Sequence, residues 1–171
     1  MLWRFQAVRP SWREWVALGS GLLALGSLFL VWTNLDAGTQ EIEDALRDLP
    51  VGDVFRNGWA SGFFVWFPAV LTLVAGILVV LFGQKETLRK SGLPQLWLVA
   101  AIVALGITAL GWFLVGWEYG SEQRELFKQA GITVYSGFGR YLGTFAVIIA
   151  LFSAVMDVRA SRVESASKGR K

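Results

Sequence analysis

Four long stretches of the sequence contain no Asp, Glu, Lys or Arg, and they constrain the fold more than any other feature. A helix needs about 20 mostly apolar residues to cross a bilayer core roughly 30 Å thick. The uncharged runs are Trp15–Thr33, Trp59–Gly83, Leu96–Gly116 and the shorter Tyr141–Met156. Four such runs cannot all be buried inside one soluble domain of 171 residues. We therefore predict an all-α membrane protein, a four-transmembrane-helix bundle that forms one integral membrane domain with spans at 15–33, 59–83, 96–116 and 137–157.

The composition narrows the chemistry available to such a protein. The chain is 54% apolar and contains no Cys and no His. Disulfides, thiolate nucleophiles and iron–sulfur clusters need Cys, while imidazole-based relays and most zinc sites need His. We also find no phosphate-binding loop, dinucleotide-binding glycine motif or nucleophile elbow in the sequence. We expect no catalytic residues, no cofactor and no metal.

The charges between the runs predict the orientation. The side with both termini and the loop 84–95 carries eleven Lys and Arg and four carboxylates. The other side, with the loops 34–58 and 117–136 and Arg140, carries five Lys and Arg and nine carboxylates. Because cationic flanks stay in the cytoplasm, we predict a multi-pass protein of the cell (inner) membrane with both termini cytoplasmic. The net charge of +3 is then a sign of topology and not of a nucleic-acid partner. We expect the basic tail 158–171 to be disordered against anionic lipid in its Ser-rich part, from Ala160 to Lys171.

Small residues recur along the predicted spans at helical spacings. Membrane helices associate where small side chains let their backbones approach closely. The candidate packing residues are Gly21, Ala24, Gly62, Ala69, Gly76, Gly139, Gly143, Ala146, Ala150 and Ala154. The second and fourth spans also carry bulky faces that could meet lipid or another subunit, and the sequence does not separate these two possibilities. Pro68 predicts a kink in the second span, with Thr72 or a neighbour compensating for the lost hydrogen bond.

Each predicted outer loop contains a short amphipathic pattern. In the first loop, Thr39 is a plausible N-cap and Pro50 a helix stop, and in the second Ser121 and Gly131 have these roles. We expect both helices to roof the outer face of the bundle. Glu41, Asp44 and Asp48 in the first are candidate contacts for a partner or a divalent cation, although the lack of a calcium-loop spacing favours a helix whose acidic face is only solvated.

These observations favour a non-catalytic accessory or scaffold subunit of a larger membrane protein complex. It would dock other integral membrane subunits and membrane lipids through its small-residue and aromatic helix faces. The alternative is a small transport or lipid- or quinone-binding membrane protein, possibly homo-oligomeric, with a cavity under Pro68 and Trp66. A third reading is a membrane enzyme that works through Glu41, Asp44 or Glu118 at the outer interface.

Three sequence features mark the ends of the first outer loop and the start of the last span. The first run ends near Trp32, the outer loop closes on Gly58-Trp59, and the last span opens with Gly-Phe-Gly-Arg-Tyr-Leu-Gly from Gly137 to Gly143. This layout resembles uncharacterised four-span membrane proteins of actinobacterial type. The outline is also similar to that of claudins without their outer-loop Cys pair. The resemblance implies a four-span fold and transfers no functional residue.

Overall fold

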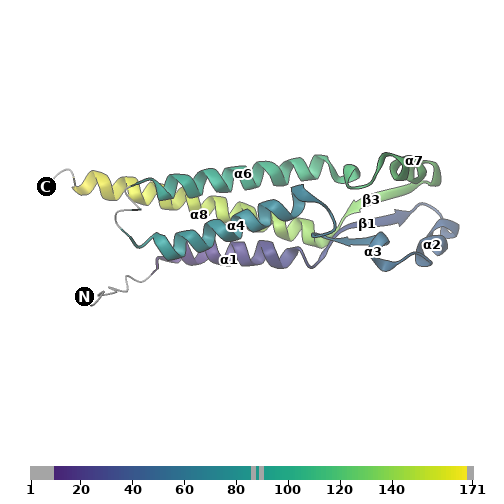
Figure 1. Ribbon diagram of the computed structural model, residues 1–171, viewed down its shortest axis with the longest axis horizontal. Helices are drawn as coiled ribbons and strands as arrows, with labels where there is room; N and C mark the ends of the chain where they lie inside the picture. The colour runs from purple at the N-terminus through teal and green to yellow at the C-terminus, as the bar shows by residue number, and fades with distance from the viewer. Residues whose placement is uncertain (1–9, 86–87, 89–90, 169–171) are drawn as a thin grey trace.

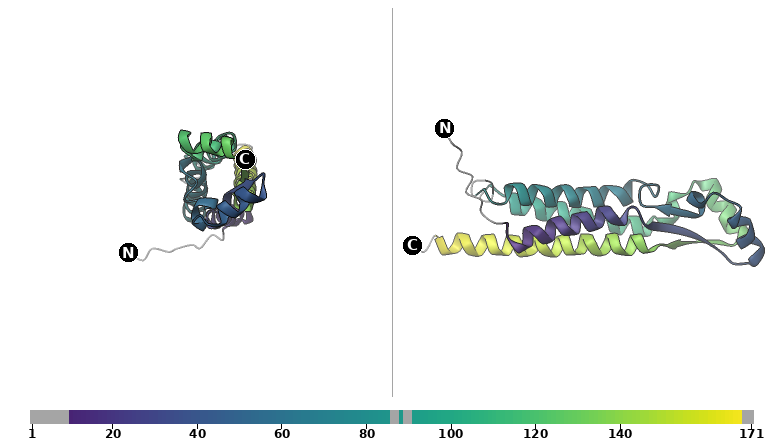
Figure 2. Two further views of the ribbon diagram at one scale, coloured as in Figure 1. Left: turned by 90° about the vertical axis from the view of Figure 1, so that its right-hand side faces the viewer. Right: turned by 90° about the horizontal axis from the view of Figure 1, so that it is seen from below.

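The molecule is an elongated bundle of four long helices that carries a smaller head at one end (Figure 1). The computed structural model describes residues 10–85, 88 and 91–168. The long helices are α1 (Trp12–Ser27), α4 (Phe63–Phe82), α6 (Leu93–Phe113) and α8 (Phe138–Lys168). Viewed end-on they form a ring in which α1 packs on α4 and α8, and α6 packs on the same two helices (Figure 2). In the described part of the chain, α4, α6 and Phe138–Val163 of α8 are long and apolar enough to cross a membrane.

The first predicted span is not a continuous helix. Helix α1 ends at Ser27, and strand β1 (Val31–Ala37) begins before the predicted end of the span at Thr33. The expectation was wrong there because an uncharged run indicates burial and does not distinguish helical from extended backbone. Val31, Trp32 and Thr33 are β-branched or aromatic, which favours a strand once a neighbouring strand is available.

Local signals explain where the helices begin. At α1, the Ser11 backbone N–H donates to the Glu14 carboxylate at 2.9 Å, and the Glu14 N–H donates back to the Ser11 hydroxyl at 3.5 Å. This capping box satisfies backbone donors that the first turn leaves free. Helix α6 begins after Gly92, whose φ of +102° favours glycine. In α4, the Thr72 hydroxyl donates to the Pro68 carbonyl at 2.7 Å, so it does not replace the backbone bond that Pro68 removes at Phe64.

The head, residues 31–57 and 115–136, contains a three-stranded antiparallel sheet that we did not predict. The strand order is β2-β1-β3, with β2 at Phe55–Asn57 and β3 at Ile132–Ser136. Thr33 of β1 lies opposite Ser136 of β3 and Arg56 of β2. Around the sheet lie α2 (Gln40–Arg47), α3 (Val51–Val54), the 3-10 turn η1 (Val115–Glu118) and α7 (Ser121–Ala130).

The two short helices were expected as a roof lying on the bundle, and this arrangement is wrong. Helices α2 and α7 do form near the predicted bounds, but both lie at the far end of the sheet (Figure 1). Their apolar side chains pack in a separate core of the head, built from Leu35, Leu46, Val54 and Tyr119. The head is therefore a small folded unit that stands on the bundle.

The predicted disordered tail is also corrected by the structure. Helix α8 continues without a break from Phe138 to Lys168, so most of 158–171 is helical. At about 1.5 Å per residue, its 31 residues span roughly 46 Å, more than the core of a bilayer. Of the cations counted on the inner side, Arg4, Arg9, Arg89, Lys90, Arg170 and Lys171 lie outside the described residues.

Most of the candidate packing residues lie between helices. A Cβ on Gly21 would lie 2.6 Å from the Leu73 Cα, and one on Gly76 would lie 2.7 Å from the Ala17 carbonyl oxygen, so α1 and α4 touch through their backbones. The five alanines in the set, Ala24, Ala69, Ala146, Ala150 and Ala154, are all buried. Gly62 is a correction: it has φ +94° and precedes α4, and a Cβ there would meet nothing within 4 Å.

Candidate functional site

A buried ion pair joins the head to the bundle. Arg140, near the start of α8, and Glu118, at the end of η1, form a salt bridge with side chains that are 1% and 8% exposed. The Arg140 guanidinium also donates to the Gly111 carbonyl oxygen in α6 at 3.0 Å. A buried charge is tolerated when it is paired with an opposite charge. Both Nη atoms of Arg140 have partners, whereas its buried Nε has no hydrogen-bond partner among the described residues. Two helices and the loop between them are therefore fixed by one side chain.

Thr33 extends this pair into the sheet. Its hydroxyl donates to Oε2 of Glu118 at 2.8 Å and accepts from Nη2 of Arg140 at 3.2 Å. Arg56 of β2 adds a hydrogen bond from Nη1 to the Glu118 backbone carbonyl at 3.1 Å. We call Thr33, Arg56, Glu118 and Arg140 the junction cluster. Both oxygens of the Glu118 carboxylate have partners within it, so this arrangement suits fixing the head in place.

Tryptophan rings enclose the Arg140 guanidinium. The centroids of Trp32 and Trp112 lie 5.9 and 5.8 Å from its Cζ, within the range of a cation–π interaction. The Trp112 indole N–H donates to the Thr144 hydroxyl at 2.9 Å, and that hydroxyl donates to the Arg140 carbonyl oxygen at 2.8 Å. The two rings therefore give the buried guanidinium aromatic neighbours in addition to its ion pair.

The glycines of the Gly-Phe-Gly-Arg-Tyr-Leu-Gly segment make room for Trp32. A Cβ on Gly139 or on Gly143 would lie 2.6 Å from atoms of the Trp32 ring. The ring is held there because its N–H donates to the Ser27 carbonyl oxygen at 2.6 Å. We predicted that these glycines pack helix on helix, and a Cβ on either would indeed lie 2.8 Å from Ser27 at the end of α1. Their closest contact, which we did not predict, is with this side chain of β1. The segment therefore allows the start of β1 to pack closely against α8.

Tyr119 forms the upper boundary of the junction cluster. It is 2% exposed, and the Arg56 guanidinium carbon lies 4.2 Å from the centroid of its ring. Its hydroxyl has no hydrogen-bond partner among the described residues. Burial raises the pKa of the phenol above its ordinary value, while the positive charge of Arg56 opposes this rise. The neutral phenol belongs to the core of the head.

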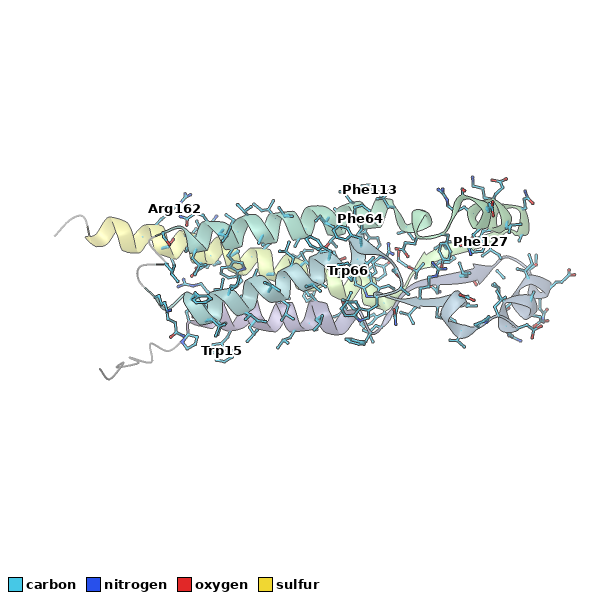
Figure 3. The ribbon with its side chains drawn as sticks, viewed as in Figure 1. Trp15, Phe64, Trp66, Phe113, Phe127 and Arg162 are labelled. Carbon is cyan, nitrogen blue, oxygen red and sulfur yellow. The ribbon has the colours of Figure 1, made fainter. Side chains whose placement is uncertain are left out.

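A second ionic contact lies at the opposite end of the bundle. Arg13 of α1 and Asp157 of α8 are 3.3 Å apart, and the Ser153 hydroxyl donates to the Arg13 carbonyl oxygen at 2.9 Å. Polar groups therefore join α1 to α8 at the end of the bundle away from the head. Figure 3 shows this end, marked by Trp15 and Arg162, far from Phe127 in the head.

The predicted contact residues of the first outer loop are exposed on α2 and around its end. Asp44 accepts from Arg47 at 3.2 Å, and Glu43 pairs with the same arginine at 2.9 Å. Glu41 and Asp48 are exposed. In the described part of the chain, no group of three or more acidic side chains has the geometry of a metal site. The structure thus brings these carboxylates to one helix but not around one point.

No family is identified for this chain. Comparisons with protein-family models, with curated proteins and with solved structures found no match. The functional argument therefore depends on the geometry above and on the surfaces described below.

The junction cluster was not predicted as a unit. We assigned Arg140 to a span end and Glu118 to a loop, and we placed Thr33 inside a helix. One signal was present in the sequence: Arg140 lies within a glycine motif directly before an apolar run, where an unpaired charge is costly. Its partner Glu118 could not be predicted, because the two residues belong to different elements and no regular helical or strand spacing relates them.

Proposed function

We propose that this protein is a non-catalytic accessory or scaffold subunit of a larger membrane protein complex. In this proposal four helices cross the membrane, with α1 and the turn after it as the fourth span. Both termini are cytoplasmic and the head lies outside. Other integral membrane subunits and lipids bind to the exposed helix faces, and partners outside the membrane bind to the head.

The observation that supports the proposal is what the buried charged side chains at the base of the head contact. Arg140 and Glu118 bind each other, Thr33 and the backbone of α6, which joins β1, η1, α6 and α8. Reactive charged groups in membrane proteins line a pathway or face a substrate. Here the charged groups hold the head and the bundle of one chain together. A subunit that binds partners through its surface needs such a fixed arrangement.

The outer surface of the bundle offers faces for such docking. On α6 a row of large apolar side chains is exposed, from Leu96 through Val99 and Val103 to Phe113, which is 85% exposed. Such a face meets either lipid tails or a helix of another subunit. Figure 3 labels Phe113 and Phe64 toward the end of the bundle that carries the head, where aromatic side chains would lie close to the membrane surface.

Purification of the native protein in mild detergent tests the proposal. We expect a second membrane subunit to co-purify at a fixed ratio, and we expect Val99→Trp on the exposed face of α6 to weaken this association. The matched control is Leu22→Trp, which places the same large side chain on α1, where Leu22 is also exposed. A monodisperse monomer with no co-purifying subunit would contradict the proposal.

One pocket favours the alternative function, binding of a lipid or quinone. An apolar pocket of about 210 Å³ lies between α4 and α6 and is lined by Leu71, Val74, Leu78, Trp97 and others. Its walls suit an acyl or isoprenoid chain. The pocket differs from the cavity under Pro68 and Trp66 that the sequence suggested, since neither residue lines it. Native mass spectrometry of the protein with and without Ala75→Phe, which would fill the pocket, tests this alternative through loss of a bound lipid.

A further inference from the structure

The head contains a groove that the junction cluster does not use. It has a volume of about 450 Å³ and lies between β1, α2, α3 and β2. This volume falls within the range of sites that bind small ligands or a few side chains of a partner. The groove is distant from the bundle, because α2 and α3 lie toward the far end of the head (Figure 1). Lipids around the bundle would therefore not reach it.

The floor of the groove is apolar and its lips are exposed. Leu35, Leu46 and Val54 line it from below and belong to the buried core of the head. Along its lips, Leu49, Val51 and Phe55 are 46%, 74% and 47% exposed. A continuous apolar surface of this kind, rimmed by polar groups, is typical of a site that binds another molecule.

The rim determines the charge of a suitable occupant. Asp36 and Glu43 both line the groove, and Arg47 is the one cation in its lining. Arg47 already pairs with Glu43 and Asp44. Asp36 is exposed and accepts no hydrogen bond or ion pair from a described residue. Residues 39–54 carry five carboxylates and one arginine, a net charge of −4. Acidic ligands are repelled here, and a cation is attracted.

We propose that this groove binds an extended segment of a partner protein that carries Lys or Arg next to large apolar side chains. The apolar side chains would enter between Leu35, Leu46 and Val54, and the cation would pair with Asp36. The proposal rests on the scaffold function given above and names the chemistry of one partner. It assigns Glu41, Asp44 and Asp48 a lesser role, that of attracting the segment without touching it.

A charge exchange tests the proposal. The full-length protein in nanodiscs of zwitterionic lipid is titrated with two fluorescein-labelled octapeptides, in which Leu alternates with Arg or with Glu. We expect the Arg peptide to bind about tenfold more tightly than the Glu peptide. Asp36→Lys should weaken binding of the Arg peptide about tenfold and strengthen binding of the Glu peptide. Leu49→Ser should weaken binding of both peptides, because it removes part of an apolar lip.

The matched control is Glu122→Lys on α7, which changes the charge equally on the head but outside the groove and its acidic rim. We expect it to alter binding of the Arg peptide less than about twofold, since exposed charges at a distance are screened. Equal effects of the two substitutions would overturn the proposal, because attraction would then depend on net charge alone. Failure of the Arg peptide to bind the wild-type protein would also overturn it. If a second membrane subunit still co-purified in that case, the scaffold function would stand without the groove.

Discussion

Arg140 of α8 contacts three other parts of the chain, β1, α6 and η1, through one guanidinium. It reaches Glu118, Thr33 and Gly111, and the rings of Trp32 and Trp112 flank it. Taking a charge out of water costs several kcal/mol, and the loss is recovered only while the partner charge and the hydrogen bonds remain in place. Single and double substitutions at this pair should therefore have very different effects.

We expect Arg140→Met to lower the free energy of unfolding by about 3–5 kcal/mol, because it leaves the Glu118 carboxylate buried without its cation. The double variant Arg140→Met with Glu118→Leu should recover most of this loss. Detergent-based unfolding followed by circular dichroism measures both. The control is Arg47→Met, which breaks exposed ion pairs and should cost about 0–1 kcal/mol. Similar losses in Arg140→Met and Arg47→Met would show that the buried pair has no special role.

Tyr119 predicts a dependence of stability on alkaline pH. Burial raises the pKa of its phenol, so the folded state favours the neutral form more than the unfolded state does. The resulting stabilisation is complete below the unfolded pKa of about 10 and is lost as the pH rises through the higher folded pKa. We expect Tyr119→Phe to reduce the loss of stability above about pH 10. The exposed Tyr135→Phe is the control, and an equal effect there would contradict the assignment.

At the level of the elements, the sequence predicted the helices well and the sheet not at all. Helices α4 and α6 fill uncharged runs of the length that a bilayer requires, and Gly131 ends α7 as expected, with φ +68°. Strand β1 was not predicted, because Trp32 and Thr33 continue an uncharged run that begins in a helix. The pairing of β1 with β3 joins segments far apart in the chain, and no local pattern reports such a contact.

The candidate site could also be predicted only in part from the sequence. The glycines at 139 and 143 were recognisable as positions of close packing, but the sequence did not show that a tryptophan ring fills the space above them. The acidic face of α2 was recognisable from its spacing, whereas the groove beneath it depends on how α3 folds back toward β1. Residue types could be predicted here, and their neighbours could not.

The packing of α8 on the base of the sheet leads to a further prediction. Gly143→Ala would place a methyl group 2.6 Å from the Trp32 ring and 2.8 Å from the Ser27 hydroxyl. We expect a loss of about 1–3 kcal/mol in the free energy of unfolding, the usual cost of overpacking. Gly106→Ala in α6 is the control, since a Cβ there meets nothing within 4 Å and an alanine favours a helix by about 0.5–1 kcal/mol. Thermal unfolding in detergent should separate the two variants in opposite directions.

On the scale of the whole molecule, the proposed orientation can be tested directly. The chain has no Cys, so a single introduced thiol reports its own position without background. We expect Ala45→Cys on α2 to react with a membrane-impermeant maleimide in intact cells. Arg162→Cys on the exposed surface of α8 should react only after the membrane is permeabilised. The reverse pattern would place the head in the cytoplasm and would contradict the proposed topology.

Helix α8 has no break between the junction cluster and its far end, and it is also fastened to α1 through Asp157 and Ser153. We therefore expect α8 to move as one rigid element. In the proposed topology, a tilt applied to the head would therefore be passed along this unbroken helix and would shift its basic end at the opposite surface of the bilayer.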